Sequence, residues 1–176
     1  MPCQKEVASR LKAPESTPTF IAALYDYPLL TRDQEHHLFR KMNYLNFRAD
    51  HLRKQMDRGN ITVARLNQTD RFLEEALQIR NVLIQSNLRL VVSIAKKLVD
   101  DVNSFDDLVS DGVVPLVRSV EIFDFDRGTR FSTYATWAVR NALFRSTPRN
   151  RKIQGRFRTG LETVFDSAAE YRSSVQ

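Results

Sequence analysis

Aromatic and basic residues lie close together in one stretch of this 176-residue chain, residues 131–145, with the letters FSTYATWAVRNALFR. A helix turns about 100° per residue, and over this stretch it would bring one mixed set of side chains within about 100° of one another. The members of this set are Tyr134, Trp137, Ala138, Asn141 and Arg145. An apolar set would form a separate face centred about 135° away, and it consists of Ala135, Val139, Ala142 and Leu143. One face can therefore pack into the protein while the other points outward.

Aromatic rings framed by cations are suited to binding single-stranded nucleic acid. Every base has a π-face that can stack on a ring, at about 1–3 kcal/mol per base, while cations follow the backbone. A Trp at the edge of a duplex can also replace an extruded base in the stack. The residues proposed for this surface beside the helical set are Arg127, Arg130, Phe131 and Arg140. Spacing alone fits core aromatics equally well, but the separation of Tyr134 and Trp137 from the aliphatic face favours binding.

The excess positive charge of the chain surrounds the same stretch. The net charge is +6, and residues 118–158 carry 10 basic and three acidic groups, whereas residues 1–117 carry 16 and 15. A local concentration of Arg is what a polyanion-binding surface needs, because each neutralised phosphate releases a condensed counterion. A solvated basic tail would have the same composition. Charge alone leaves both interpretations open.

Four helical segments are expected to position these residues. The first begins at a capping box of Thr31 and Gln34 and ends near residues 58–60. The second begins near Thr69, with a break expected around residues 86–87. Apolar residues recur three, four or seven apart along both segments: Leu38, Met42, Leu45 and Ala49 in the first, and Leu73, Leu77, Ile84, Leu88, Val91, Ala95 and Leu98 in the second.

The third and fourth helices are marked by their caps. The third is predicted to start at Ser104, with Asp107 completing a capping box. Its inner stripe is Leu108, Gly112, Leu116 and Val120. Pro115 lies inside this pattern and should kink or split the helix, because proline lacks a backbone donor. A loop over residues 124–130 should lead into a fourth helix that is capped by Ser132 and stops before Pro148.

The fold class expected from these patterns is all-α, a compact helical bundle with an N-terminal helical extension. The predicted divisions are a flexible leader over residues 1–17, the extension over 18–60, the main helical domain over 61–147, and a basic then polar tail over 148–176. Apolar runs are too short for a membrane span, and the one cysteine, Cys3, fits a reducing compartment, so the cytoplasm is expected.

Enzymatic and metal-binding classes have little support in the sequence. His36, His37 and His51 lack a set of partner ligands at metal-binding spacing, so they fit helix-surface histidines better. Gly112 and Gly128 stand alone rather than in a phosphate-binding loop. We therefore expect no catalytic residue, no metal site and no cofactor.

Three groups of residues together resemble the second region of primary-type bacterial RNA polymerase sigma factors. They are the run Asn87–Lys97 (NLRLVVSIAKK), then Asp107-Leu108 and Arg127-Gly128, and the run Phe131–Trp137 (FSTYATW). The resemblance is dense over residues 79–147 and weaker over 19–50, where Leu30–Glu35 (LLTRDQE) resembles the helix preceding that region. It implies a helical domain that binds polymerase core and opens the minus-ten promoter element.

The resemblance also implies a role for individual residues. Phe131, Tyr134 and Trp137 match aromatics that capture a flipped base of the non-template strand, and Ser132 and Thr133 match polar residues beside that base. Four arginines match positions where the family has cations, and they are Arg127, Arg130, Arg140 and Arg145. The acidic helix resembles the surface that docks on the coiled coil of the polymerase β′ subunit; its matching residues are Asp107, Ser110, Asp111 and Val113. An anti-sigma factor is a further candidate partner.

Several positions depart from the family pattern. Ala138 stands where a second Trp is usual, which would halve the wedge that melts the duplex. Thr129, Asn141, Phe144, Val113 and Pro115 also differ from the usual residues. Two other classes remain open: a helical regulator that binds duplex DNA alone, and a sigma mimic that occupies the core and blocks initiation.

Overall fold

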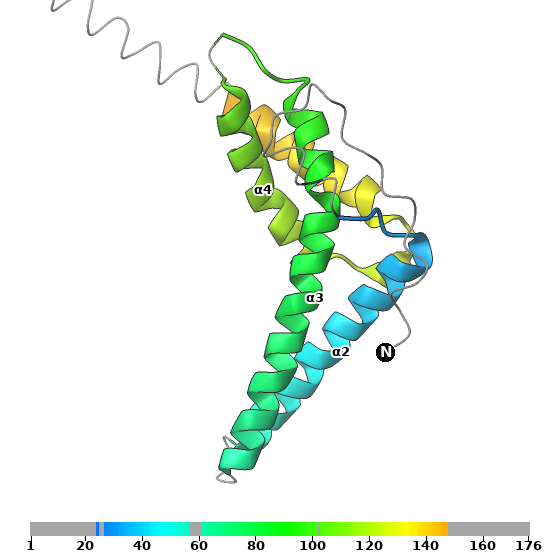
Figure 1. Ribbon diagram of the computed structural model, residues 1–176, viewed down its shortest axis with the longest axis vertical. Helices are drawn as coiled ribbons and strands as arrows, with labels where there is room; N and C mark the ends of the chain where they lie inside the picture. Colours follow the sequence, from blue (N-terminus) through cyan, green and yellow to red (C-terminus); the bar gives the residue numbers. More distant parts are fainter. Residues whose placement is uncertain (1–23, 25–26, 57–60, 102, 148–176) are drawn as a thin grey trace, which may run out of the picture.

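The computed structural model describes residues 24, 27–56, 61–101 and 103–147, and within these ranges it contains helices and turns but no β-strand. The elements are α2 (Arg32–Met56), α3 (Val63–Ala95), α4 (Phe105–Ile122), the short 3-10 helix η2 (Phe125–Arg127) and a helix over residues 131–147, called helix 131–147 below. Helices α2 and α3 form a long antiparallel pair, and α4 and helix 131–147 gather around the second half of α3 (Figure 1). The predicted all-α class is confirmed.

The capping box predicted for the first helix is present at the start of α2. The Gln34 amide donates to the Thr31 hydroxyl at 3.3 Å, and the Thr31 amide donates to Gln34 Oε1 at 3.0 Å. Two amides that have no partner inside the helix are satisfied in this way. The expected end near residues 58–60, the leader over 1–17 and the tail over 148–176 lie outside the described residues.

Helix α3 differs from its prediction in two respects. It starts at Val63 rather than near Thr69, because the amides of Arg65 and Leu66 already bond to the Thr62 carbonyl. It also runs through the expected break at residues 86–87 without interruption. The Asn87 side chain donates to the Leu83 carbonyl at 2.8 Å, so this polar residue is satisfied within the helix instead of ending it.

A hydrogen-bonded turn joins α3 to α4. The backbone amide and side-chain amide of the buried Asn103 both donate to Asp100 Oδ1 at 2.8 Å. The Ser104 hydroxyl then accepts from the Asp107 amide at 3.2 Å, so the predicted N-cap of α4 is confirmed. These bonds fix the angle at which the chain enters α4.

Pro115 was predicted to kink or split α4; the helix continues through it, so the split is wrong, and the kink stays a prediction. A proline removes only one backbone donor, and the helix can persist when the rest of its face is well packed. The predicted inner stripe of four residues is buried throughout: Leu108, Gly112, Leu116 and Val120. The Ser119 hydroxyl also donates to the Pro115 carbonyl at 2.7 Å, which places a further bond in the turn after the proline.

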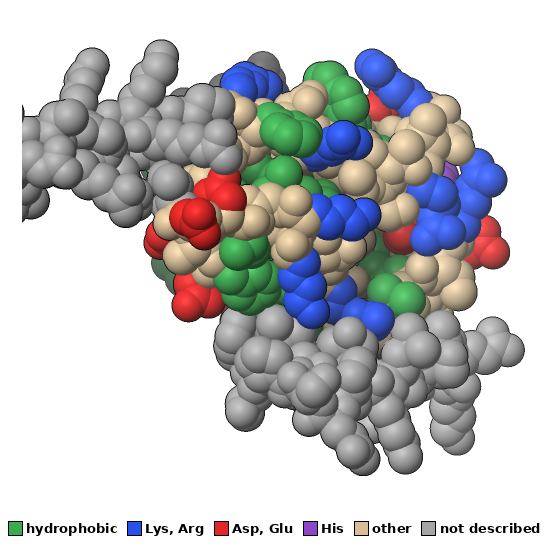
Figure 2. Space-filling view, turned by 90° about the horizontal axis from the view of Figure 1, so that it is seen from above, with side chains coloured by type: hydrophobic (Ala, Val, Ile, Leu, Met, Phe, Trp, Pro, Cys, Tyr) green, Lys and Arg blue, Asp and Glu red, His purple; other side chains and the backbone are tan. Residues whose placement is uncertain are grey.

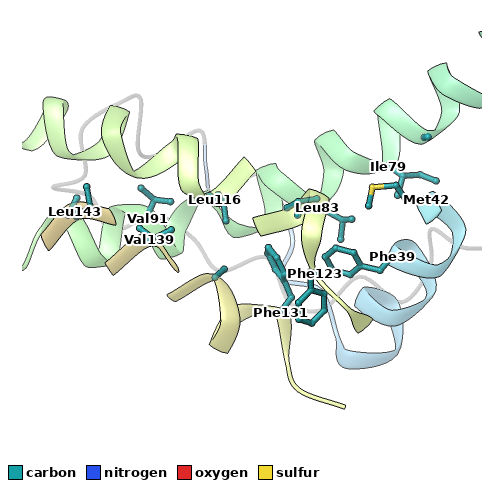
Figure 3. Close-up of a cluster of buried hydrophobic side chains, with 14 of the residues drawn as sticks. Phe39, Met42, Ile79, Leu83, Val91, Leu116, Phe123, Phe131, Val139 and Leu143 are labelled. Atoms are coloured by element: carbon teal, nitrogen blue, oxygen red, sulfur yellow. The ribbon is translucent and has the colours of Figure 1, made fainter. Parts of the chain in front are cut away.

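The core joins all the helices (Figure 3). Three phenylalanine rings meet there, one from α2 and two from residues 123–131. Their centroids are 4.9 Å apart for Phe39 and Phe123, 5.1 Å for Phe39 and Phe131, and 5.2 Å for Phe123 and Phe131. Aromatic pairs at such distances contribute about 0.5–1.5 kcal/mol beyond the area they bury. The ring of Phe39 therefore ties α2 to the start of helix 131–147.

The predicted domain boundary between residues 60 and 61 stays a prediction. In the described part of the chain, none of the helices has the length and apolar character needed to cross a membrane.

We expect Gly112→Ala to lower the free energy of unfolding by about 1–2 kcal/mol, since overpacking costs about 1–3 kcal/mol and better helix propensity offsets part of it. A Cβ at Gly112 would lie 2.6 Å from Cγ1 of Val91, and the side chains of Val139 and Leu143 are in ordinary contact distance. Urea unfolding of the full chain measures the effect. Combining the change with Val91→Ala should give less than the sum of the two losses; additive losses would contradict the close approach.

Candidate nucleic-acid interface

The loop before helix 131–147 is shaped by short-range hydrogen bonds. Asp124 caps η2 by accepting from the Asp126 amide at 3.1 Å, and its other oxygen lies 3.0 Å from Nε of Arg127. Gly128 follows with a φ of 72°, a left-handed conformation that glycine adopts without strain. The Arg32 guanidinium of α2 donates to the Gly128 carbonyl at 2.7 Å. The loop is thus held from within and from α2.

A two-pronged ion pair ties α2 to the end of this loop. Nε and Nη2 of Arg130 each donate to a carboxylate oxygen of Glu35 at 2.9 Å, and Nη2 also reaches the Leu30 carbonyl at 3.3 Å. The Glu35 side chain is only 8% exposed, whereas that of Arg130 is 43% exposed. The hydrogen bond to Glu35 raises the pKa of the Arg130 guanidinium, despite the opposing effect of burial. The positive charge of Arg130 is therefore largely neutralised by the carboxylate of Glu35.

The structure corrects the position expected for Phe131. Its side chain is fully buried against Phe39 and Phe123, so it does not lie on the outward surface with Trp137. The helix also begins two residues earlier than predicted. The Arg130 carbonyl accepts from the amides of Thr133 and Tyr134, so Arg130 rather than Ser132 precedes the first turn. Phe131 lies in that first turn, where it turns inward.

The two predicted faces of helix 131–147 are present. The aliphatic face is fully buried at Ala135, Val139 and Leu143. Trp137 is 67% exposed, which excludes the interpretation that it is an ordinary core aromatic. Tyr134 is half-buried, with its ring 5.6 Å from that of Phe123 between centroids. Of the three matched aromatics, Trp137 is therefore the most exposed.

The remaining proposed DNA-binding residues differ in exposure. Arg140, Arg145, Arg127 and Thr133 are exposed, and Ser132, Ala138 and Asn141 are half-buried. The Arg140 guanidinium lies 5.3 Å from the centroid of the Phe144 ring, and Nε of Arg145 donates to the Asn141 carbonyl at 3.3 Å. Neither of these two guanidinium groups forms an ion pair with the described residues. Figure 2 views the molecule from above, and basic side chains lie there between hydrophobic ones.

The face of α4 that was predicted to bind polymerase is exposed at Asp107, Ser110 and Asp111, whereas Val113 is half-buried. Asp107 also uses its backbone amide in the Ser104 cap, but its carboxylate is left outward. The sequence reasoning missed Val114, which is 70% exposed on the same helix. Val114 lies four residues after Ser110, one helical turn further along, so helical spacing could have placed it on the same face. Acidic groups beside an exposed aliphatic side chain suit a protein partner.

Glu35 is the main site residue that the sequence reasoning missed. In the sequence, Glu35 is only an acidic residue in the first turn of a helix, and capping and dipole effects are enough to explain such a residue. The pairing with Arg130 spans 95 residues of sequence and is visible only in the folded chain. A search of the described residues finds no group of three or more His, Cys, Asp or Glu that could hold a metal ion.

Comparison with known proteins identifies the matching segment. Residues 83–153 match the family described as Sigma-70 region 2. The RNA polymerase sigma factor SigA1 of Synechococcus elongatus is 46% identical over 81 residues, which cover 46% of this chain and 20% of that protein. SigA of a Nostoc species is 51% identical over 67 residues, covering 38% and 17%, and SigA of Microcystis aeruginosa is 53% identical over 64 residues, covering 36% and 15%. The matched part thus spans a fifth or less of these relatives.

Proposed function

We propose that this chain, which carries a Sigma-70 region 2 over residues 83–153, works as a sigma factor. It would bind RNA polymerase core in the cytoplasm, direct it to promoters and melt the minus-ten element, with no catalytic centre of its own. The single observation that carries the proposal is the 67% exposed Trp137 on a helix whose opposite face is fully buried at Ala135, Val139 and Leu143. An indole held outward by a packed helix suits stacking on a base.

On the DNA side, the proposed ligand is the non-template strand of the minus-ten element. Trp137 would stack at the upstream edge of the melted segment, and Arg140 and Arg145 would contact phosphates. The smaller polar residues of this surface are Ser132, Thr133 and Asn141, and they would line the path of the strand. Arg130 would act differently, because its ion pair with Glu35 supports its use in positioning the loop.

On the polymerase side, we propose that the exposed face of α4 docks on the coiled coil of the β′ subunit. Asp107 and Asp111 would meet basic residues, and Val114 would add apolar contact. Rim charges of this kind affect association rate and partner choice more than the total affinity. An anti-sigma factor would compete most simply by covering the same face.

A second candidate function is favoured by one residue. Ala138 occupies the position of the usual second Trp and is half-buried, so the melting surface has a single outward indole. A chain with a weak wedge could occupy the core without opening promoters efficiently, as a sigma mimic. Such a chain would bind core but support no transcript from any promoter. A regulator acting alone would instead bind duplex DNA without polymerase.

The test is co-elution of the full chain with bacterial core polymerase, followed by transcription from a promoter library. We expect one complex at micromolar concentration and promoter-dependent transcripts. Asp107→Arg should slow association with the core and lower the affinity about tenfold or more, because it reverses the charge and like-charge juxtaposition at an interface costs several kcal/mol. Asp126→Arg, an exposed acid of η2, is the matched control and should leave core affinity unchanged. Two separate species on the column would contradict the proposal.

A further inference from the structure

A pocket of about 370 Å³ lies where α2, α3 and the end of α4 meet. Four apolar side chains line one part of it, and they are Met42 of α2 and Leu73, Ala76 and Leu77 of α3. Met42 and Ala76 are each 4% exposed, whereas Leu77 is 50% exposed, so the apolar lining reaches from the core to the surface. Pockets that hold small molecules have volumes of about 300–1,000 Å³ and are lined mostly by apolar side chains. The size and the apolar lining therefore suit a small ligand.

Two oppositely charged side chains line the same pocket. Nη2 of Arg80 lies 3.4 Å from Oε1 of Glu121, and the two side chains are 35% and 49% exposed. Nε of Arg80 is shielded from solvent and has no hydrogen-bond partner among the described residues. Buried donors in folded proteins nearly always have a partner, because leaving one unsatisfied is costly. The guanidinium group therefore has donors that a ligand can satisfy.

The charges at this edge of the pocket select for a ligand that carries both signs. A carboxylate can accept two parallel hydrogen bonds from an arginine, and an ammonium group can donate to a glutamate. An anion alone would be repelled by Glu121, and a cation alone would be repelled by Arg80. A free α-amino acid carries both charges next to one carbon atom, whereas a peptide carries them at its opposite ends. The pair of side chains therefore favours a free amino acid over a peptide.

We propose that this pocket binds a free α-amino acid with an aliphatic side chain. Arg80 would turn its guanidinium group to the carboxylate, which gives Nε a partner, and Glu121 would accept from the ammonium group. The aliphatic side chain would lie on Met42 and the apolar lining from α3, where it leaves water. Asn43 and Asn46 are exposed on the α2 side of the pocket, and their amides add donors and acceptors for the charged groups.

The amino-acid site goes beyond the promoter function proposed above. The residues that line the pocket are separate from those proposed to bind DNA and from those of α4 proposed to bind polymerase. Binding of the amino acid therefore requires neither partner. A chain that binds no amino acid can still be a sigma factor, and a chain that binds no polymerase can still hold an amino acid, so the two proposals fail separately.

Isothermal titration calorimetry of the full chain with L-leucine tests the proposal. We expect saturable binding with a dissociation constant of about 0.1–1 mM, which is in the range for a ligand of so few atoms. Two analogues test the recognition of both charges, since isocaproate lacks the ammonium group and isoamylamine lacks the carboxylate. Each analogue should bind about tenfold more weakly than leucine or worse, because it leaves either Arg80 or Glu121 without its partner.

Variants of the charged pair locate the binding. Arg80→Gln should weaken leucine binding about tenfold or more, because an amide cannot replace the paired, charge-assisted hydrogen bonds to a carboxylate. Arg71→Gln is the matched control, since Arg71 is an exposed arginine of α3 outside the pocket lining, and it should leave binding unchanged. Glu121→Gln should also weaken leucine binding, but it should strengthen isocaproate binding, because it removes the repulsion of a carboxylate. Circular dichroism confirms that each variant folds.

Three results would overturn the proposal. The first is the absence of saturable heat at millimolar leucine. The second is equal binding of leucine and isocaproate, because the pocket would then recognise an aliphatic carboxylate rather than an amino acid. The third is an equal loss of binding in Arg71→Gln and Arg80→Gln, which would mean that leucine responds to the net charge of the chain and not to this pocket.

Discussion

Trp137→Ala is expected to lower promoter opening about tenfold or more while core binding and stability stay unchanged. The indole is 67% exposed, so its loss leaves no cavity in the core. Stacking contributes about 1–3 kcal/mol per base, and here it would be realised only once the base pair opens. Open-complex formation on a labelled promoter, compared with co-elution on core polymerase, measures the two effects separately. Equal loss in both assays would assign Trp137 a structural role.

Two further variants sharpen this result. Thr136→Ala changes the exposed residue next to Trp137 and is the matched control, although it removes a 2.7 Å hydrogen bond to the Ser132 carbonyl. Ala138→Trp restores the second aromatic at a half-buried position, and we expect it to increase promoter opening. If Ala138→Trp leaves opening unchanged, the missing indole is not what limits the melting surface.

Glu35→Ala is expected to lower the free energy of unfolding by about 1–2 kcal/mol and to weaken promoter-strand binding as well. Removing the carboxylate leaves two donors of Arg130 without their partner, and water compensates in part because the Arg130 side chain is 43% exposed. The loop over residues 124–130 then loses one of its ties to α2. Urea unfolding and oligonucleotide binding measure the two consequences.

Exchanging the charges of Glu35 and Arg130 distinguishes the effect of the ion pair from the effects of the individual residues. Glu35→Arg and Arg130→Glu should each be more damaging than Glu35→Ala, because each places like charges together beside the core. The double exchange should recover part of the stability. Recovery of stability without recovery of strand binding would mean that Arg130 also contacts the nucleic acid. No recovery of either quantity would contradict the importance of the pair.

The helices were predictable where a local signal marked them. Thr31 and Ser104 each carry a cap that depends on residues three positions away, and both caps are present. The start of α3 was missed because the Thr62 side chain makes no capping bond. Pro115 was expected to kink or split α4, yet the helix continues through it beside a buried stripe. Tertiary packing prevailed over a local preference in this case.

The sequence predicted the two faces of the helix that carries the candidate site, but it did not predict that Phe131 is buried. Helix geometry placed Trp137 outward and Val139 inward, and both positions are confirmed. Phe131 was assigned to the outward surface because its neighbours resemble a binding motif, but the rings of Phe39 and Phe123 draw it into the core. Phe131 lies four residues before Ala135 and eight before Val139, so helical spacing puts it on the aliphatic face once the helix begins after Arg130. The prediction missed this because it placed the cap at Ser132. The assignment of individual residues to DNA or polymerase stays a prediction.

The pairing of Glu35 with Arg130 also has a consequence for synthesis of the chain on the ribosome. The two residues are 95 positions apart. At a synthesis rate of about 5–20 residues per second, Arg130 is added roughly 5–20 s after Glu35, and Glu35 has no ion-pair partner until then. During that interval Phe39 also lacks Phe123 and Phe131, so the inner face of α2 must rely on α3 for cover. Nascent chains stalled before residue 123 should therefore be the ones that most need a chaperone.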